Sequence, residues 1–125
     1  MKTSETLAKA KSLIADPAKW HKGDWVKPGD ASCMCAMGAV ALATDLDFET
    51  SEMTKVIGSK FEFYLAAAVG YVIPESDQYR SNAPKPSIVA GSRRFALYND
   101  RDYTTHEMVM AAFDKAIEMA QFDND

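Results

Sequence analysis

The sequence predicts an all-α fold: a single compact domain over residues 1–125, with four to five helices, two long loops and room for a short β-hairpin in the first loop. Three observations carry this prediction. Apolar residues recur with a period near 3.6 in several segments, which is the spacing of an amphipathic helix. Capping residues and prolines mark where those segments begin and end. The 125 residues are 47% hydrophobic and 26% charged, which is ordinary for a globular protein.

The first helix is predicted over residues 4–15. Its apolar face consists of Leu7, Ala10, Leu13 and Ile14. Thr3 or Ser4 is expected to cap its start, because a side-chain oxygen there can accept an unpaired backbone N–H. Asp16 and Pro17 then end the helix, and Pro17 suits the first position of a further short turn.

A run of small and sulfur-bearing residues, 33–43, follows a segment at 20–30 that reads as a loop or a short irregular hairpin. Asp30 is expected to cap a helix over 31–43, because its carboxylate can accept backbone N–H groups of the first turn. Small side chains let backbones approach closely. We therefore expect this helix at the centre of the fold, with Trp20 and the turn at 98–100 as neighbours.

The next helix is predicted to start at a cap on Thr50 or Ser51 and to end at Pro74. Its broad apolar face consists of Met53, Val56, Ile57, Phe61, Tyr64, Leu65, Ala68 and Val69. Residues 74–87 contain three prolines and predict an exposed loop. Residues 87–97, interrupted by Gly91, fit either a helix or a partly extended segment.

The last helix has the clearest signals. Thr104 and Glu107 match a capping box, in which each side chain accepts a backbone N–H at the helix start. The predicted apolar face consists of Val109, Ala112, Phe113, Ala116, Ile117 and Ala120. The acidic tail at 121–125 is expected to fray.

Charge and composition narrow the classes of partner. The formal net charge of −4 argues against nucleic acid, because such binding depends on Lys and Arg neutralising phosphates. No apolar stretch reaches the roughly 20 residues that span a bilayer. The first residues also lack the apolar core of a signal peptide. We therefore expect a cytoplasmic protein with no membrane partner and with reduced cysteines.

Metal and thiol chemistry are the two options for the sulfur atoms. The candidate residues are Cys33, Cys35, His21 and His106. On the helix predicted over 31–43, residues two apart point roughly 200° from one another, so both thiols would not meet one metal. We expect no metal, no cofactor and no catalytic residue, with the cysteines acting as small core residues. The alternative is a thiol enzyme, because Cys33 three residues after the Asp30 cap would have its pKa lowered by the helix dipole.

Polar and aromatic residues in the predicted loops are the candidates for binding. The turn at 98–102 packs an amide, two carboxylates and a guanidinium ahead of a helix, which suits an anionic ligand. Asn and Asp also bond their own backbone in turns, which is the structural explanation of the same residues. Loop aromatics can stack on a planar ligand or a partner protein. The candidate ligand- or partner-binding residues are Trp25, Tyr79, Arg93, Arg94, Tyr98, Asn99 and Arg101.

Several short motifs, in this order and spacing, resemble a family of small uncharacterised proteins of bacteria and their phages, classed as a domain of unknown function. The motifs are Trp20-x-x-Gly23, Cys35-x-x-Gly38-Ala39, Tyr98-Asn99-Asp100 and, in the final helix, Lys115-Ala116-Ile117. The resemblance covers residues 7–117. The family often has Trp where Tyr98 stands and lacks the Pro-rich insertion at 74–86.

The resemblance implies no assigned activity, and its phage association suggests a role toward the host, such as interference with defence. We therefore expect a small non-enzymatic binding protein, in the host cytoplasm if phage-encoded. It would bind a host protein or sequester a small anionic ligand such as a nucleotide. The alternatives are a thiol-dependent hydrolase or transferase using Cys33, with His106, His21 or Asp100 as its partner, and an assembly subunit that forms a homo-oligomer.

Overall fold

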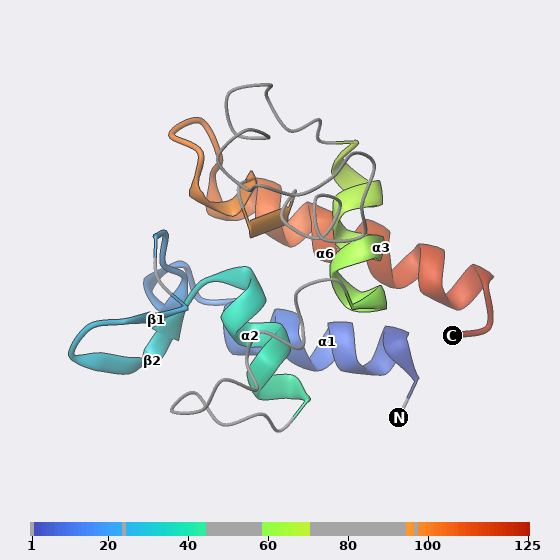
Figure 1. Cartoon of the computed structure of the whole chain (residues 1–125), viewed down its shortest axis with the longest axis horizontal. Helices are drawn as coiled ribbons and strands as arrows, with labels where there is room; N and C mark the ends of the chain where they lie inside the picture. The colour runs from blue at the N-terminus through green and yellow to red at the C-terminus, as the bar shows by residue number, and fades with distance from the viewer. Residues whose placement is uncertain (1, 24, 45–58, 71–94, 97) are drawn as a thin grey trace, which may run out of the picture.

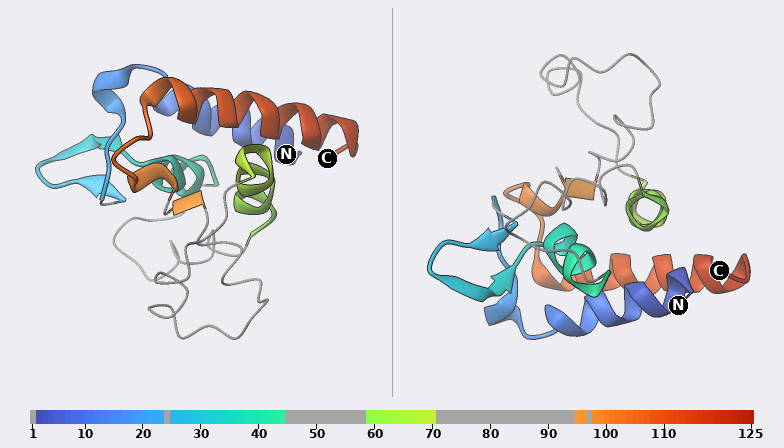
Figure 2. Two further views of the ribbon diagram at one scale, coloured as in Figure 1. Left: turned by 90° about the horizontal axis from the view of Figure 1, so that it is seen from above. Right: turned by 60° about the horizontal axis from the view of Figure 1, so that its bottom comes forward.

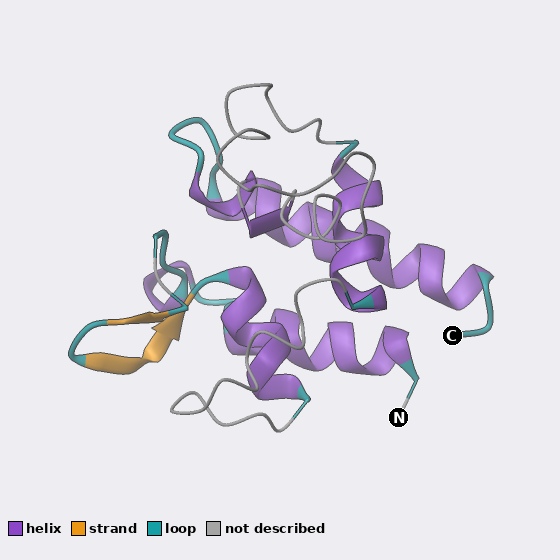
Figure 3. Ribbon diagram, viewed as in Figure 1, coloured by secondary structure: helices purple, strands orange, loops and turns teal. Residues whose placement is uncertain are grey.

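A computed structural model describes residues 2–23, 25–44, 59–70, 95–96 and 98–125. The described chain is mostly helical and includes one small antiparallel sheet of two strands (Figure 1, Figure 3). The elements are α1 (Thr3–Leu13), the 3-10 turn η1 (Pro17–Lys19), β1 (Val26–Lys27), β2 (Asp30–Met34), α2 (Ala36–Ala43), α3 (Lys60–Val69) and α6 (His106–Phe122). The prediction of a mainly helical fold with a hairpin in its first loop is confirmed.

Two long helices form the base of the fold. Figure 2 shows α1 and α6 side by side and running in opposite directions, with α2 and α3 on one side of them. Contacts between α1 and α6, between α3 and α6, and between α1 and α2 dominate the packing. The hairpin of β1 and β2 projects from the end of the molecule opposite to the N and C labels of Figure 1.

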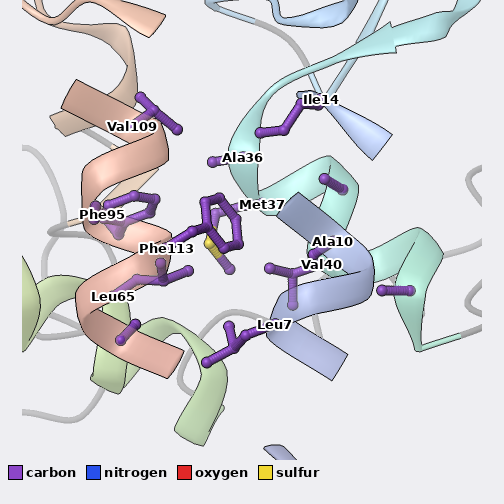
Figure 4. Packing of buried hydrophobic residues seen from close by; sticks show 14 of the residues in the cluster. Leu7, Ala10, Ile14, Ala36, Met37, Val40, Leu65, Phe95, Val109 and Phe113 are labelled. Atoms are coloured by element: carbon purple, nitrogen blue, oxygen red, sulfur yellow. The ribbon is translucent and has the colours of Figure 1, made fainter. Parts of the chain in front are cut away.

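The core lies between these helices (Figure 4). Leu7 of α1, Val40 of α2 and Leu65 of α3 are fully buried there. The Phe95 ring contacts the Phe113 ring edge-on at 6.3 Å between centroids. The alanines of α2 are also buried, namely Ala36, Ala39, Ala41 and Ala43. This agrees with the prediction that a helix of small residues is closely packed at the centre.

The two ends of the chain meet, which corrects two expectations. The N-cap of α1 is Lys2, and its side chain makes no capping hydrogen bond. Thr3 and Ser4 are buried inside the helix, where the Thr3 hydroxyl donates to Asp125 Oδ1 at 2.8 Å and the Ser4 N–H donates to the Asp125 carbonyl at 2.9 Å. The segment predicted to fray, 121–125, is helical through Phe122 and then bonded to α1.

The region predicted as one helix over 31–43 is divided between a strand and a shorter helix. Residues 30–34 pair with β1 across a two-residue Pro28–Gly29 turn, in which Gly29 has φ of 83°. Pro followed by Gly with positive φ is the pattern of a type II turn. Asp30 is therefore not a helix cap: its Oδ1 accepts from the Ser32 N–H at 3.1 Å and the Ser32 hydroxyl at 2.5 Å. The N-cap of α2 is Cys35.

The ends of the other helices also differ from prediction. The N-cap of α3 is Ser59, not Thr50 or Ser51, so this helix is shorter than predicted. α3 ends at Val69, where Gly70 adopts the left-handed conformation at φ of 58°, so Pro74 is not its stop signal. The N-cap of α6 is Thr105, whose hydroxyl accepts from Met108 N–H at 3.2 Å. Thr104, the predicted cap, instead donates its hydroxyl to the Tyr98 carbonyl at 2.6 Å. The prediction that Asp16 and Pro17 end the first helix and start a short turn is confirmed by η1.

Several predicted features lie outside the described residues. They are the caps at Thr50 and Ser51, the apolar positions Met53, Val56 and Ile57, the Pro-rich loop at 74–87 and the segment 87–94. Among the described helices, none has the length and apolar character needed to cross a membrane.

Candidate functional site

Three of the four motifs singled out in the sequence meet at one place, which we call the Asn99 junction: residues 20–23, 35–38 and 98–100. Asn99 is 1% exposed and lies at its centre. Its Oδ1 accepts from the Trp20 indole N–H at 2.7 Å and from the Ala36 backbone N–H at 3.2 Å. Its Nδ2 donates to the His21 carbonyl at 3.2 Å. One amide side chain therefore joins the Trp20 loop, the start of α2 and residues 98–100, which were predicted as a turn but are helical.

Asp100 and Lys22 extend this connection toward the surface. Asp100 Oδ1 accepts from the Gly23 N–H and from Asn99 Nδ2, each at 2.9 Å. Lys22 Nζ donates to the Arg101 carbonyl at 2.5 Å and stands 5.5 Å from the centre of the Trp20 ring, a cation–π distance. The loop at 20–23 and the segment 98–101, in which residues 98–100 are helical, are thus joined both in the interior and at the surface.

The contacts of Cys35 and Gly38 explain why the second motif, Cys35-x-x-Gly38-Ala39, has these residues. The Cys35 Sγ accepts from the Gly38 N–H at 3.3 Å, so the thiol caps α2. The Cys35 N–H donates to the Trp25 carbonyl at 3.1 Å. A Cβ at Gly38 would overlap this same carbonyl oxygen. Glycine is required here because the Trp25 backbone crosses directly against the first turn of α2.

The surroundings of the thiols disfavour nucleophilic chemistry. Burial raises the pKa of Cys35 to about 11, despite hydrogen bonds from the backbone that lower it. A thiol with so high a pKa carries little thiolate at neutral pH. Cys33 lies in β2 and is 3% exposed. The expectation that Cys33 sits in the first turn of a helix was wrong, so the helix-dipole argument for a reactive Cys33 does not apply.

The histidines are placed by structural contacts. His106 is the first residue of α6 and its Nε2 lies 2.6 Å from the Ile14 carbonyl, so this nitrogen donates. Its ring also contacts the Trp20 ring at 5.9 Å between centroids. His106 is half-buried. In the described part of the chain, no group of three or more His, Cys, Asp or Glu residues could hold a metal ion.

The candidate binding residues divide into three sets. Tyr98, 8% exposed, and Asn99 are buried in the junction, and their assignment as ligand contacts stays a prediction. Trp25 and Arg101 are half-buried at its edge. Tyr79, Arg93 and Arg94 lie outside the described residues.

Tyr103 is one of the aromatic residues in or beside the predicted loops, but it was not included among the candidate binding residues. It is 58% exposed, and its ring contacts the buried Tyr98 ring edge-on at 6.5 Å. Its place in the loop between a capping turn and α6 was the signal, since large aromatics in such loops are commonly binding residues. Lys22 was also missed, because nothing in its local sequence indicates that it would reach Arg101 and Trp20.

Comparison with known proteins gives one match. A family model described as a family of unknown function (DUF6197) matches residues 1–119. Neither the curated proteins nor the solved structures gave a match. The match agrees with the resemblance stated from the motifs, and it covers each residue of the Asn99 junction.

Proposed function

We propose that this chain, which belongs to a family of unknown function, is a small non-enzymatic binding protein. The proposal is based on the Asn99 junction. The protein's contact surface is formed by residues 21–23 and 25 and by residues 100–103. Its partner is a host protein in the cytoplasm and, if the chain is phage-encoded, the binding interferes with host defence. The observation that carries this proposal is that the motif residues hold these loops together internally.

The internal hydrogen bonds support binding rather than catalysis. The polar atoms of Asn99 and the Asp100 Oδ1 form hydrogen bonds with residues 20–23 and with the Ala36 N–H at the start of α2. The thiol of Cys35, a second motif residue, has a raised pKa. A loop that is ordered before binding loses less conformational entropy when a partner arrives. The Asn99 junction would therefore preorganise the proposed contact surface for binding.

The side chains at the surface of the two loops suit a protein partner. Tyr103 is exposed and braced by Tyr98, while Trp25 and Arg101 are half-buried. Tyr, Trp and Arg are enriched at protein interfaces and among the residues that dominate binding energy. Tyr103 would supply a rigid contact area at low entropic cost.

Sequestration of a nucleotide-like anion is the second candidate. A half-buried Arg101 ahead of α6 favours it, since a cation near a helix N-terminus suits an anionic group. The two candidates differ in size of partner and can be separated by experiment.

The test compares two exposed aromatics at different places on the molecule. Tyr103→Ser removes the braced tyrosine of the contact surface, and Phe63→Ser is its control, because Phe63 of α3 is 70% exposed. Tagged wild type and both variants are used to capture host proteins, and each is screened for thermal shifts with nucleotides. We expect a host protein that is captured by wild type and Phe63→Ser and lost with Tyr103→Ser. Equal capture of the host protein by all three proteins would contradict the proposed contact surface. A shift of the melting temperature with a nucleotide, without capture of a host protein, would favour sequestration.

A further inference from the structure

At the opposite end from the Asn99 junction, residues 123–125 contact the starts of two helices. Asp125 Oδ1 accepts from the Thr3 hydroxyl of α1 at 2.8 Å and from Lys60 Nζ of α3 at 3.0 Å. Asp123 Oδ2 accepts from the Tyr64 hydroxyl of α3 at 2.6 Å. Two carboxylates that follow α6 therefore join α1 and α3 to it. We call this set of contacts the clasp.

The backbone of the clasp is a defined helix ending. Asn124 adopts φ of 58°, the Asn124 N–H donates to the Gln121 carbonyl at 3.0 Å, and the Asp125 N–H donates to the Ala120 carbonyl at 2.8 Å. This pair of bonds with a left-handed residue is a Schellman motif. Asn is among the residues that tolerate the left-handed conformation. The motif turns the chain back, which brings Asp125 over the start of α1.

The clasp also provides a hydrogen-bond acceptor for the start of α1. Its N-cap Lys2 makes no side-chain capping bond, and the first N–H groups of a helix have no partner within it. The Asp125 carbonyl accepts one of these N–H groups, that of Ser4. A carboxylate beside a helix start also interacts favourably with the helix dipole.

We propose that the clasp is a conformational device: when it opens, the first turn of α1 and the start of α3 separate from the end of α6, while the Asn99 junction stays closed. The clasp and the Asn99 junction differ in burial, as separate opening of the clasp requires. The junction depends on a buried amide, whereas the clasp depends on the half-buried Asp125 carboxylate and the exposed Asp123 carboxylate. Local opening draws on regions whose hydrogen bonds are solvent-exposed and whose apolar contacts are few.

Hydrogen exchange of individual backbone amides tests the proposal. Asp125→Ala removes the carboxylate that joins α1 and α3, and Asp114→Ala is the matched control, because Asp114 of α6 also pairs with α1, through Lys11 Nζ at 2.6 Å. In Asp125→Ala we expect the amides of Ser4 and Thr6 to exchange several-fold faster, with the amides of Gly23 and Ala36 unchanged. In Asp114→Ala we expect no change at Ser4.

Other outcomes decide against the clasp. Unchanged exchange at Ser4 in Asp125→Ala would show that the carboxylate does not hold this end. Equal acceleration at Ser4 and Ala36 would show that the whole molecule opens together. Tyr64→Phe, which removes a single hydroxyl, gives a milder version of the test if Asp125→Ala does not fold, and it is expected to accelerate exchange at the start of α3 alone.

Discussion

At the scale of single residues, Asn99 makes the most consequential contacts. It is buried and uses both ends of its amide, so any replacement leaves polar groups of other elements without a partner. A buried group that loses its hydrogen bond costs the full desolvation penalty.

Asn99→Ala is expected to lower the free energy of unfolding by about 3 kcal/mol, because the Trp20 indole N–H and the Ala36 N–H both lose their acceptor. Urea denaturation followed by tryptophan fluorescence measures it. The control is Asp102→Ala, an exposed neighbour, for which we expect a change within about 0.5 kcal/mol. A comparable loss in both variants would contradict the central role of Asn99.

Gly38 should behave opposite to an ordinary helical glycine. Gly→Ala inside a helix usually stabilises by about 0.5–1 kcal/mol, but a methyl group here overlaps the Trp25 carbonyl oxygen. We expect Gly38→Ala to destabilise by about 1–3 kcal/mol, as overpacking does. Thermal unfolding of Gly38→Ala beside Ala39→Gly, the reverse change at the next position, provides the comparison. A higher melting temperature for Gly38→Ala would refute the close crossing.

Cys35 is expected to react slowly with alkylating reagents at neutral pH. Its pKa is raised to about 11 from an ordinary value of 9.0, so its thiolate fraction near pH 8 is lower by roughly two orders of magnitude than that of a free thiol. Iodoacetamide labelling of a Cys33→Ser variant between pH 7 and about pH 11 measures the rate of Cys35 alone. The rate should rise continuously over this range. Fast labelling that saturates near pH 8 would instead support the thiol-enzyme alternative.

At the scale of elements, sequence patterns predicted α1 and α6 well and α2 poorly. The helical period at 4–15 and 105–120 reflects faces that each helix buries, so it is visible locally. The start of α2 is set by partners far away: Trp25 accepts from Cys35, and Met34 accepts from His21. The Pro28-Gly29 pair indicates a turn, but no local signal indicates that a strand continues after it to Met34. The N-cap of α6 was predicted at Thr104 and lies at Thr105. The two neighbouring threonines carry the same hydroxyl, so the sequence does not distinguish them.

Thr105→Ala is expected to destabilise the protein by about 1 kcal/mol, because the hydroxyl that accepts from Met108 N–H is lost. Thr105→Ser keeps the hydroxyl and should be nearly neutral. Chemical denaturation of the pair isolates the capping bond. If Thr105→Ala and Thr105→Ser are equally stable, α6 does not begin where the structure places it.

At the scale of the whole molecule, two sets of polar contacts hold opposite ends of one helical core. The sequence indicated that Trp20, the small-residue helix and the turn at 98–100 would be neighbours, and the structure confirms it. It did not indicate which atoms join them, because a hydrogen bond between residues 79 positions apart follows from the packed fold. The clasp was missed for a related reason. In the sequence an acidic tail indicates exposure to solvent, and only the tertiary fold places the starts of α1 and α3 beside it.

The clasp should make stability depend on pH in the acid range. The Thr3 hydroxyl and then Lys60 hold the pKa of Asp125 below its ordinary value of 3.8. The unfolded chain therefore takes up this proton first as the pH falls, so the contribution of Asp125 is complete above about pH 5 and is lost below its folded pKa. We expect the difference in unfolding free energy between wild type and Asp125→Ala to be greatest near neutral pH and to shrink as the pH is lowered toward about 2.

Urea titrations at a series of pH values measure this difference. Asp30 also has a lowered pKa, through its hydrogen bonds with Ser32, so wild type alone would not separate the two carboxylates. Asp30→Ala is accordingly measured in parallel, and the double variant should lose the sum of the two effects, because Asp30 lies in the hairpin and Asp125 at the other end of the molecule (Figure 1). A difference for Asp125→Ala that is the same at every pH would mean that its charge does not hold the clasp closed.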